Sequence, residues 1–500
     1  MSSSTSQAPT ERMSSKRSEF NDGRKRPIYS WSDSFRDWVK QSFYGNYTDL
    51  QVESNLLSVL PFYPESDGKR IAKVINTDIG NGNYIHELYI ENIETPIHPD
   101  FEQESQIINN NGVITTTKNH SPRDVVLIHG YAASLGLFID NFDSLSKIPG
   151  IKIHAIDLLG FGFSARPNFP NFKSETAEDV KKTEDWFIDA IEIWRQKRNI
   201  NRFVLMGHSF GGYLSCCYAL KYQTKLTNNL NLIDKLVLIS PVGLERNKFS
   251  LLKNIQESYI TKSSQLRQNE QSSSRDIEQE VLANQEEIVS SASTTTSTAK
   301  SINEEATPMN NNESSATSED EIEDEEDTTP KTRRAKIIRK MWDNNFSPFS
   351  IVRNVGPMKS KLISGWTTHR FSHVYYSNPQ HFQNMHDYIY RVFNAKGSGE
   401  YAITRVLAFG ALAKLPLLDR CPEKFVDWKL PTLWLYGDKD WMNEEAGEEM
   451  TKEINQLAKK KNYNDELARF RILSNSGHHL YLDNPPDFAK EIFSFLKLKK

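Results

Sequence analysis

The sequence predicts an α/β protein in which a mostly parallel sheet carries helices on both faces. Two observations predict this fold class. Short apolar runs alternate with stretches of helical periodicity along most of the chain, and the runs lack the polar alternation of a sheet with one face in water. With 500 residues, of which 37% are hydrophobic, the chain is long enough for such a core and for a second unit beside it.

The expected sheet starts with a hairpin and continues as strands separated by helices. Residues 70–93 alternate around Gly80-Asn81-Gly82-Asn83, which is typical of two strands joined by a tight turn. Further strands are expected at residues 125–129, 151–157, 203–206, 236–239, 433–436 and 470–473. Helices are expected at residues 136–147, 175–198, 210–223 and 485–496.

The alternation of strands and helices stops between the sixth and the seventh expected strand. Residues 262–336 consist mostly of Ser, Thr, Asn, Gln and acidic side chains, which predicts a long disordered insert because such a segment cannot offset its ordering entropy. Residues 337–428 are rich in aromatic side chains and predict a helical cap, whose start is expected at residues 246–261. The core is therefore expected in two parts, residues 70–245 and 429–500.

An N-terminal extension, residues 1–69, precedes the expected core. Within it, residues 31–43 place Trp31, Phe35 and Trp38 at helical spacing. An aromatic face of this kind suits either the headgroup boundary of a lipid bilayer or packing against the core. Both alternatives stay open at this point.

Composition and charge exclude several classes of protein. Lys and Arg number 61 and Asp and Glu 65, a net charge of −4, which argues against a basic protein that wraps nucleic acid. Three cysteines, Cys216, Cys217 and Cys421, cannot build a disulfide framework, which favours a reducing compartment. The sequence shows neither a bilayer-spanning apolar run nor a signal-peptide core. The first 27 residues are Ser-rich and basic like a mitochondrial presequence, apart from three acidic residues, so an intracellular protein is expected.

A candidate nucleophile lies in the pentapeptide Gly207-His208-Ser209-Phe210-Gly211. The pentapeptide follows an expected strand and opens an expected helix. Small residues at its two ends permit the tight strand-to-helix turn that holds a serine, in a strained conformation, above a sheet. The alternative for Ser209 is a turn serine that caps the following helix.

Two backbone N–H groups are expected to face Ser209. His129-Gly130-Tyr131 ends an earlier strand, and the glycine lets the backbone turn there. The N–H groups of Tyr131 and Phe210 would then form an oxyanion hole, which is the largest single contribution to catalysis in many acyl-transfer enzymes.

A candidate acid and a candidate base each follow a strand expected near the C-terminus. The order Ser209, Asp440, His478 is the chain order of an α/β-hydrolase triad. Asp438 is the alternative acid, although it is more typical of a turn residue, and His479 is the alternative base. In this chemistry His478 takes the serine proton and Asp440 holds the productive tautomer, so neither a metal nor a cofactor is expected.

Several motifs also carry a resemblance to a known family. They are residues 129–134 (HGYAAS), 157–164 (DLLGFGFS), 207–213 (GHSFGGY), 437–442 (GDKDWM) and 477–485 (GHHLYLDNP), with residues 347–357 (SPFSIVRNVGP) in the expected cap. From Val125 onwards, outside the insert, the chain resembles the α/β-hydrolase family of lipid-droplet lipase coactivators and N-acyl-phospholipid lipases. Its fungal branch of mitochondrial cardiolipin deacylases and lysophosphatidic acid acyltransferases is the most similar. The resemblance implies an α/β-hydrolase fold with the cap inserted after strand 6, and it explains neither the acidic insert nor the N-terminal extension.

The last of these motifs contains an H-x-x-x-x-D element, His478 to Asp483. The family associates this element with acyltransferase activity. The alternative is that Asp483 caps the closing helix.

The resemblance implies an enzyme that acts on acyl esters of glycerophospholipids. The first hypothesis is a cardiolipin-specific deacylase of the phospholipase A type in mitochondrial phospholipid remodelling. The second is a lysophosphatidic acid acyltransferase that makes phosphatidic acid from acyl-CoA, and the third is a non-catalytic lipase coactivator, against which the complete triad argues. The expected partners are anionic membrane phospholipids and, for the second hypothesis, acyl-CoA. The expected location is peripheral to the mitochondrial inner membrane, with the cytosol or a lipid droplet as the alternative.

Overall fold

The computed structural model describes residues 28–43, 48–95, 102–108, 114–120, 123–224, 231–252, 340, 342 and 347–496. The predicted disordered insert, residues 262–336, lies outside the described residues, as do the first 27 residues.

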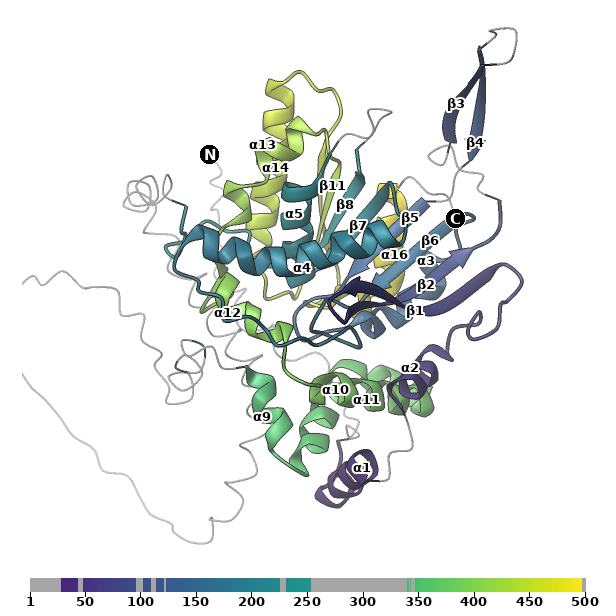
Figure 1. The fold of residues 1–500 in the computed structure, drawn as a ribbon, viewed down its shortest axis with the longest axis vertical. Helices are drawn as coiled ribbons and strands as arrows, with labels where there is room; N and C mark the ends of the chain where they lie inside the picture. Colours follow the sequence, from purple (N-terminus) through teal and green to yellow (C-terminus); the bar gives the residue numbers. More distant parts are fainter. Residues whose placement is uncertain are drawn as a thin grey trace, which may run out of the picture.

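An eight-stranded sheet forms the centre of the molecule, in the order β1-β2-β6-β5-β7-β8-β11-β12 (Figure 1). Its strands are β1 (Arg70–Gly80), β2 (Asn83–Asn92), β5 (Arg123–Ile128), β6 (Ile151–Ile156), β7 (Phe203–His208), β8 (Ile233–Ile239), β11 (Thr432–Gly437) and β12 (Ala468–Leu473). The β1–β2 and β2–β6 pairs are antiparallel, and all the other neighbours in this sheet are parallel. The predicted strands are therefore confirmed, with boundaries that differ by a few residues.

Helices cover both faces of the sheet and form a separate layer at one side of it (Figure 1). They are α1 (Trp31–Phe43), α2 (Asp49–Leu57), α3 (Ile139–Leu145), α4 (Ala177–Lys197), α5 (Phe210–Tyr222), α9 (Pro348–Asn354), α10 (Met358–Ser377), α11 (Pro379–Asn394), α12 (Ile403–Val406), α13 (Pro422–Asp427), α14 (Glu444–Lys460), α15 (Leu480–Asp483) and α16 (Pro485–Leu496). Short turns of 3-10 helix are η2 (Leu135–Phe138), η3 (Gly399–Ala402) and η4 (Leu417–Asp419). Two further antiparallel strand pairs lie outside the large sheet: β3 (Glu102–Ile108) with β4 (Ile114–His120), and β9 (Leu407–Ala408) with β10 (Leu412–Ala413). No helix within the described ranges combines the length and the apolar character needed to cross a bilayer.

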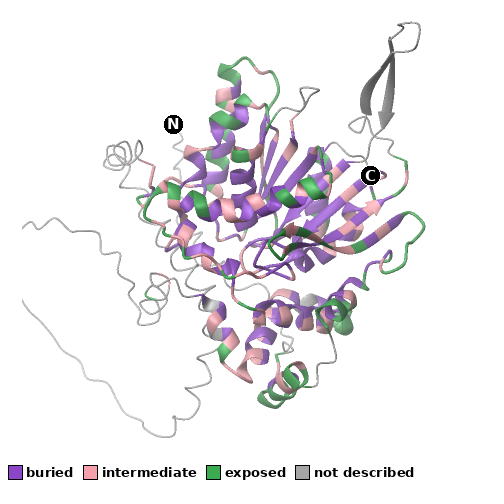
Figure 2. Cartoon of the chain, in the orientation of Figure 1, coloured by how far each residue is buried: buried purple, intermediate pink, exposed green. Residues whose placement is uncertain are grey.

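The inner strands of the sheet are mostly apolar because both of their faces are buried, whereas the edge strands β1 and β12 carry exposed residues (Figure 2). In β5, Val126 and Ile128 belong to the apolar cluster that contains α4, α5 and α14. Val125 and Leu127 point the other way, into the cluster that contains α3 and α16. This two-sided burial accounts for the continuous apolar runs from which the fold class was predicted.

The cap is inserted after β8, the sixth strand of the large sheet, as predicted. Its helices α9, α10 and α11 lie beside α1 and α2 in the separate layer (Figure 1). Tyr388 of α11 joins the cap to the core: its hydroxyl accepts the N–H of Gly136 at 3.3 Å, and its ring lies 5.3 Å from that of Phe163. A Cβ at Gly136 would lie 2.5 Å from the Tyr388 ring, so only glycine fits at this contact.

Helix α2 is part of the folded body although the sequence did not predict it. Leu56 and Leu57 are fully buried beside the cap and the core. Glu53 is 1% exposed and accepts from Nε2 of His86 at 2.8 and 2.9 Å, while Nδ1 of His86 faces Asn76 Oδ1 at 2.7 Å. Burial alone would lower the pKa of His86, but the Glu53 carboxylate raises it above its usual value. The extension is thus fastened to β2 by a buried ion pair.

The predicted helix over residues 31–43 is confirmed as α1, but its packed face is the polar one. Ser34 and Asp37 are buried against the cap, and the Ser34 hydroxyl donates to the Pro357 carbonyl at 2.6 Å. Trp31 is 48% exposed and Phe35 53% exposed. Trp38 and Val39 are half-buried, so α1 packs on the cap mainly through its polar residues while Trp31 and Phe35 stay exposed.

Candidate active site

Ser209 lies at the carboxyl end of β7, in the turn that starts α5. Its backbone has φ 52° and ψ −118°, a left-handed conformation that costs an ordinary residue about 1–3 kcal/mol. Three hydrogen bonds hold it there: the Ser209 N–H donates to Ile239 O at 2.9 Å, and Ser209 O accepts from Tyr213 N at 3.1 Å and Val242 N at 3.4 Å. The strained strand-to-helix turn predicted for this serine is present, but the expected exposed position is not, because Ser209 is buried and only 6% exposed.

The glycines around Ser209 are required by close backbone contacts. A Cβ at Gly211 would lie 2.3 Å from His129 O, and one at Gly207 would lie 2.4 Å from Gly211 O. A Cβ at Gly130 would lie 2.9 Å from the Cβ of Ser209. These contacts bring the end of β5 directly against the serine turn.

The predicted acid and base lie together at the carboxyl ends of β11 and β12. Nδ1 of His478 donates to Oδ1 of Asp440 at 3.2 Å, and both side chains are at most 8% exposed. Asp440 also accepts the N–H of Met442 at 3.0 Å. The alternative acid, Asp438, is exposed and accepts the backbone N–H of Ser476 at 2.9 Å, as expected of a turn residue.

His208 links the serine turn to the predicted base, a contact that sequence reasoning missed. Its Nε2 donates to the backbone oxygen of His478 at 3.0 Å, and the two rings lie 4.8 Å apart. Burial lowers the pKa of His208 well below its usual value, so this ring is neutral. Among the described residues, no hydrogen bond joins Ser209 Oγ to His478. The serine turn contacts the base through His208, the residue before Ser209, which is bonded to the His478 carbonyl. The alternative base, His479, also has its pKa lowered by burial, and its ring lies 4.9 Å from that of His208.

The two backbone N–H groups predicted for the oxyanion hole flank Ser209. Phe210 is the first residue of α5, and Tyr131 follows Gly130, which is in contact with the serine. Among the described residues, neither N–H has an acceptor. Their role as an oxyanion hole stays a prediction.

Two buried groups hold the loops around the end of β5. His129 is fully buried; its Nδ1 donates to Gly130 O at 2.7 Å and its Nε2 accepts from Leu158 N at 3.0 Å. Burial lowers the pKa of His129 to about 4, so the ring is neutral. Asp157 accepts the N–H groups of Leu135 and Phe163, each at 2.7 Å. The motif at residues 157–164 therefore supports the loops beside the site through the Asp157 carboxylate and the Leu158 N–H.

Asp483 lies at the end of α15 and is exposed. Its Oδ2 accepts the N–H of Gly477 at 2.8 Å. The alternative in which Asp483 caps the closing helix is wrong, because the side chain that accepts at the start of α16 is Asn484, from Asp487 N at 3.3 Å.

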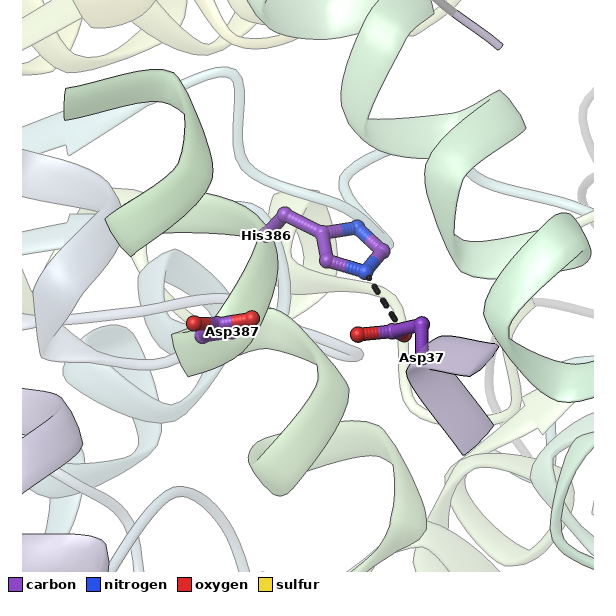
Figure 3. A group of neighbouring side chains, drawn as sticks. All are labelled: Asp37, His386 and Asp387. Carbon is purple, nitrogen blue, oxygen red and sulfur yellow. Dashed lines mark hydrogen bonds and ion pairs between the residues drawn. The ribbon is translucent and has the colours of Figure 1, made fainter. Parts of the chain in front are cut away.

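One group among the described residues has the donor types and spacing for a metal ion: Asp37, His386 and Asp387, with ligand atoms within 4.8 Å of one another (Figure 3). It lies where α1 meets α11. His386 Nε2 is hydrogen-bonded to Asp37 at 3.2 Å, and Asp387 accepts from Gln41 and Gln383, each at 2.9 Å. Burial acts to raise the pKa of Asp37, but the bond from His386 lowers it below its usual value. Asp37 and His386 are paired with each other, Asp387 is bound by two glutamines, and we assign the group as the polar contact that holds α1 to the cap.

Comparison with known proteins identifies similar chains. Residues 125–270 match the model of a family described as alpha/beta hydrolase fold. A probable 1-acylglycerol-3-phosphate O-acyltransferase of Oryza sativa subsp. japonica is 28% identical over 383 residues, 76% of this chain and 68% of that protein. The 1-acylglycerol-3-phosphate O-acyltransferase ICT1 of Saccharomyces cerevisiae is 27% identical over 403 residues, 74% of this chain and 81% of that protein. A (lyso)-N-acylphosphatidylethanolamine lipase of Bos taurus is 38% identical over 138 residues, 27% of this chain and 36% of that protein.

Proposed function

Because the chain is an α/β-hydrolase whose relatives include lipid acyltransferases and a lipase, we propose that it cleaves acyl esters of glycerophospholipids through an acyl-enzyme on Ser209. The observation that carries the proposal is the strained Ser209 turn beside the hydrogen-bonded Asp440–His478 pair. A strained serine, a buried imidazole and a buried carboxylate at one edge of a sheet form the arrangement used for nucleophilic acyl transfer.

The proposed reaction starts with proton transfer from Ser209. Because Asp440 holds the Nδ1 proton of His478, the lone pair that can accept the serine proton is on Nε2. The serine oxygen then bonds to the ester carbonyl carbon, and the N–H groups of Tyr131 and Phe210 bind the resulting oxyanion. Collapse releases the lysophospholipid alkoxide, which takes the proton from His478, and a water or a second hydroxyl then removes the acyl group by the same steps in reverse.

Two features of the cap support a phospholipid substrate. A row of aromatic rings leads from Tyr131 into the cap: Tyr131–Phe349 at 5.9 Å, Phe349–Phe393 at 5.1 Å and Phe393–Trp366 at 5.3 Å. Phe349 and Phe393 are at most 9% exposed, so a fatty acyl chain bound at this place would contact aromatic side chains that now pack on one another. Arg370 of α10 places its positive charge near His479, where it adds to the effect of burial in lowering that pKa. A cation at this position favours an anionic headgroup.

A lysophosphatidic acid acyltransferase is the second candidate, because two of the relatives carry that activity in their names. The two candidates share the acyl-enzyme and differ in what removes the acyl group. The resemblance to fungal mitochondrial enzymes implies cardiolipin as the first donor to test and the mitochondrial inner membrane as the location.

Product analysis with the full-length protein tests the proposal and separates the candidates. Vesicles containing cardiolipin are incubated with the protein alone, and separately with acyl-CoA and lysophosphatidic acid. We expect free fatty acid and a lysocardiolipin without added acyl-CoA. Phosphatidic acid that forms only when acyl-CoA and lysophosphatidic acid are both present would favour the second candidate. The absence of both products would contradict the enzymatic proposal.

The exposed face of α1 supports binding to a membrane surface. Trp31, Phe35 and Phe43 expose 48%, 53% and 70% of their surface, although burial of such side chains is normally favourable. Lys361 of the cap lies over the Trp31 ring at 4.9 Å, and Arg36 is exposed on the same helix. Aromatic side chains with adjoining cations suit the headgroup region of an anionic bilayer.

Replacement of both Trp31 and Phe35 by serine is expected to weaken vesicle binding at least roughly tenfold. Each aromatic side chain contributes about 1.5–3 kcal/mol when it leaves water, and about 1.4 kcal/mol corresponds to a factor of ten. Co-sedimentation with anionic vesicles measures the change, and circular dichroism checks that the fold is kept. The matched control is Ile472→Ser, since Ile472 of β12 is 48% exposed at the far edge of the sheet. Equal binding by the double variant and the wild type would rule out α1 as the membrane contact.

A further inference from the structure

The loop that presents His478 is held by hydrogen bonds at both of its ends. This segment, residues 474–479, is called the His478 loop here and runs from β12 to α15. On the β11 side, the N–H of Ser476 donates to Asp438 at 2.9 Å, and Ser476 O accepts from Lys439 N at 2.9 Å. A Cβ at Gly437 would lie 2.1 Å from Ser476 O, so this end of the loop packs directly on β11.

The other end of the loop is held by the serine turn and by α15. His208 donates from Nε2 to the His478 carbonyl at 3.0 Å. Asp483 accepts the N–H of Gly477, the residue before the imidazole, at 2.8 Å. The backbone of α15 returns to the same loop, since the N–H groups of Leu482 and Asp483 donate to His479 O at 2.7 and 3.1 Å. The backbone on both sides of His478 is therefore hydrogen-bonded, and the Asp483 carboxylate supplies one of these bonds.

The two ends of the H-x-x-x-x-D element have different partners. The His478 imidazole donates to Asp440, which is buried, while the Asp483 carboxylate faces a backbone N–H at an exposed position. A carboxylate that transfers protons in acyl transfer needs to reach the imidazole or the attacking hydroxyl. In the structure, the Asp483 carboxylate is bonded to the Gly477 N–H instead.

We propose that Asp483 is a positioning residue: it fixes the Gly477–His478 backbone so that the imidazole keeps its bond to Asp440 and its place next to the Ser209 turn, and it takes no chemical part in acyl transfer. The proposal rests on the proposed function, because it assigns His478 as the base. One exposed hydrogen bond adds little to folding stability, whereas small displacements of a catalytic group reduce turnover strongly. The element is then required equally for transfer to water and for transfer to a lipid hydroxyl.

Two variants at this position separate the alternatives. Asp483→Ala removes the acceptor, whereas Asp483→Asn removes the charge and keeps an oxygen that can accept the Gly477 N–H. The matched control is Asp465→Ala, since Asp465 is exposed three residues before β12, at the end of that strand opposite the site. All proteins are assayed at full length for hydrolysis of a soluble p-nitrophenyl ester and for the rate of labelling of Ser209 by a fluorophosphonate. Neither assay requires the lipid substrate to be known.

We expect Asp483→Ala to lower kcat and the labelling rate about tenfold to a hundredfold, with KM and the melting temperature nearly unchanged. Asp483→Asn should recover most of both rates, and Asp465→Ala should match the wild type. Where acyl transfer to lysophosphatidic acid is detected, Asp483→Ala should lower it by the same factor as hydrolysis.

Three results would overturn the proposal. They are wild-type rates in Asp483→Ala, an Asp483→Asn variant no faster than Asp483→Ala, and a loss of acyl transfer that leaves hydrolysis intact. A wild-type protein that is inert with the fluorophosphonate would instead refute the proposed function, so the two failures are distinguishable.

Discussion

Replacement of Ser209 by alanine is expected to remove turnover and labelling by a fluorophosphonate while the protein stays folded. Removal of the nucleophile from a serine hydrolase lowers kcat by roughly a millionfold, because neither the acyl-enzyme nor its activated attack remains. The fold is expected to persist, since Ser209 is held by its backbone N–H and carbonyl rather than by its hydroxyl. Ester hydrolysis, intact-protein mass after labelling and the melting temperature measure these effects.

The matched control is Ser215→Ala. Ser215 is a buried serine of the same helix, and its hydroxyl donates to Gly211 O at 2.7 Å. The activity of the Ser215→Ala variant should stay within a few-fold of the wild type. If Ser209→Ala still acquires the label, Ser209 is not the nucleophile. If the wild type and Ser209→Ala are equally inert, the non-catalytic coactivator becomes the better description.

Asp440→Asn is expected to lower kcat by about ten-thousandfold, the effect known when the acid of a serine triad becomes an amide. Asp440 Oδ1 holds the Nδ1 proton of His478 at 3.2 Å. An amide at this position can donate to Nδ1 instead, which moves the ring proton to Nε2 and leaves no lone pair facing Ser209. KM should change little, because this carboxylate is fully buried. Steady-state kinetics on the soluble ester measure both constants.

Asp438→Asn serves as the control for Asp440→Asn. An asparagine at this position keeps an oxygen that can accept the Ser476 N–H, so kcat is expected to stay within a few-fold of the wild type. The opposite ranking of the two variants would show that the acid was assigned to the wrong aspartate.

The features predicted correctly from the sequence are those encoded by local patterns. Strands with both faces buried are apolar along their whole length, and β5, β7 and β11 were found for that reason. The Ser209 turn was found because its glycines are forced by sterics: Gly207 and Gly211 face backbone oxygens at 2.4 and 2.3 Å. Asp440 and His478 follow two strands that are neighbours in the sheet, so their approach follows from topology.

The features that sequence reasoning missed depend on contacts between distant segments. Glu53 in the middle of α2 reads as a solvent-facing residue, and only its pairing with His86 explains its burial. The aromatic side of α1 was expected to be the packed side if the helix packed at all, yet Asp37 faces the cap because His386 is there to bind it. The contact of His208 with the loop of the base likewise has no local signal, since its partner is 270 positions away.

Because α2 is buried against the core, the smallest fragment that can fold has to begin before the first strand. A protein trimmed to begin at Arg70 would keep every strand of the large sheet, but it would uncover the surface that Leu56 and Leu57 occupy and strip the charged His86 ring of its counter-ion. Boundaries chosen by the sheet alone would therefore divide a cooperative unit. The folding unit used to design expression vectors, to interpret limited proteolysis and to compare relatives should therefore include this helix.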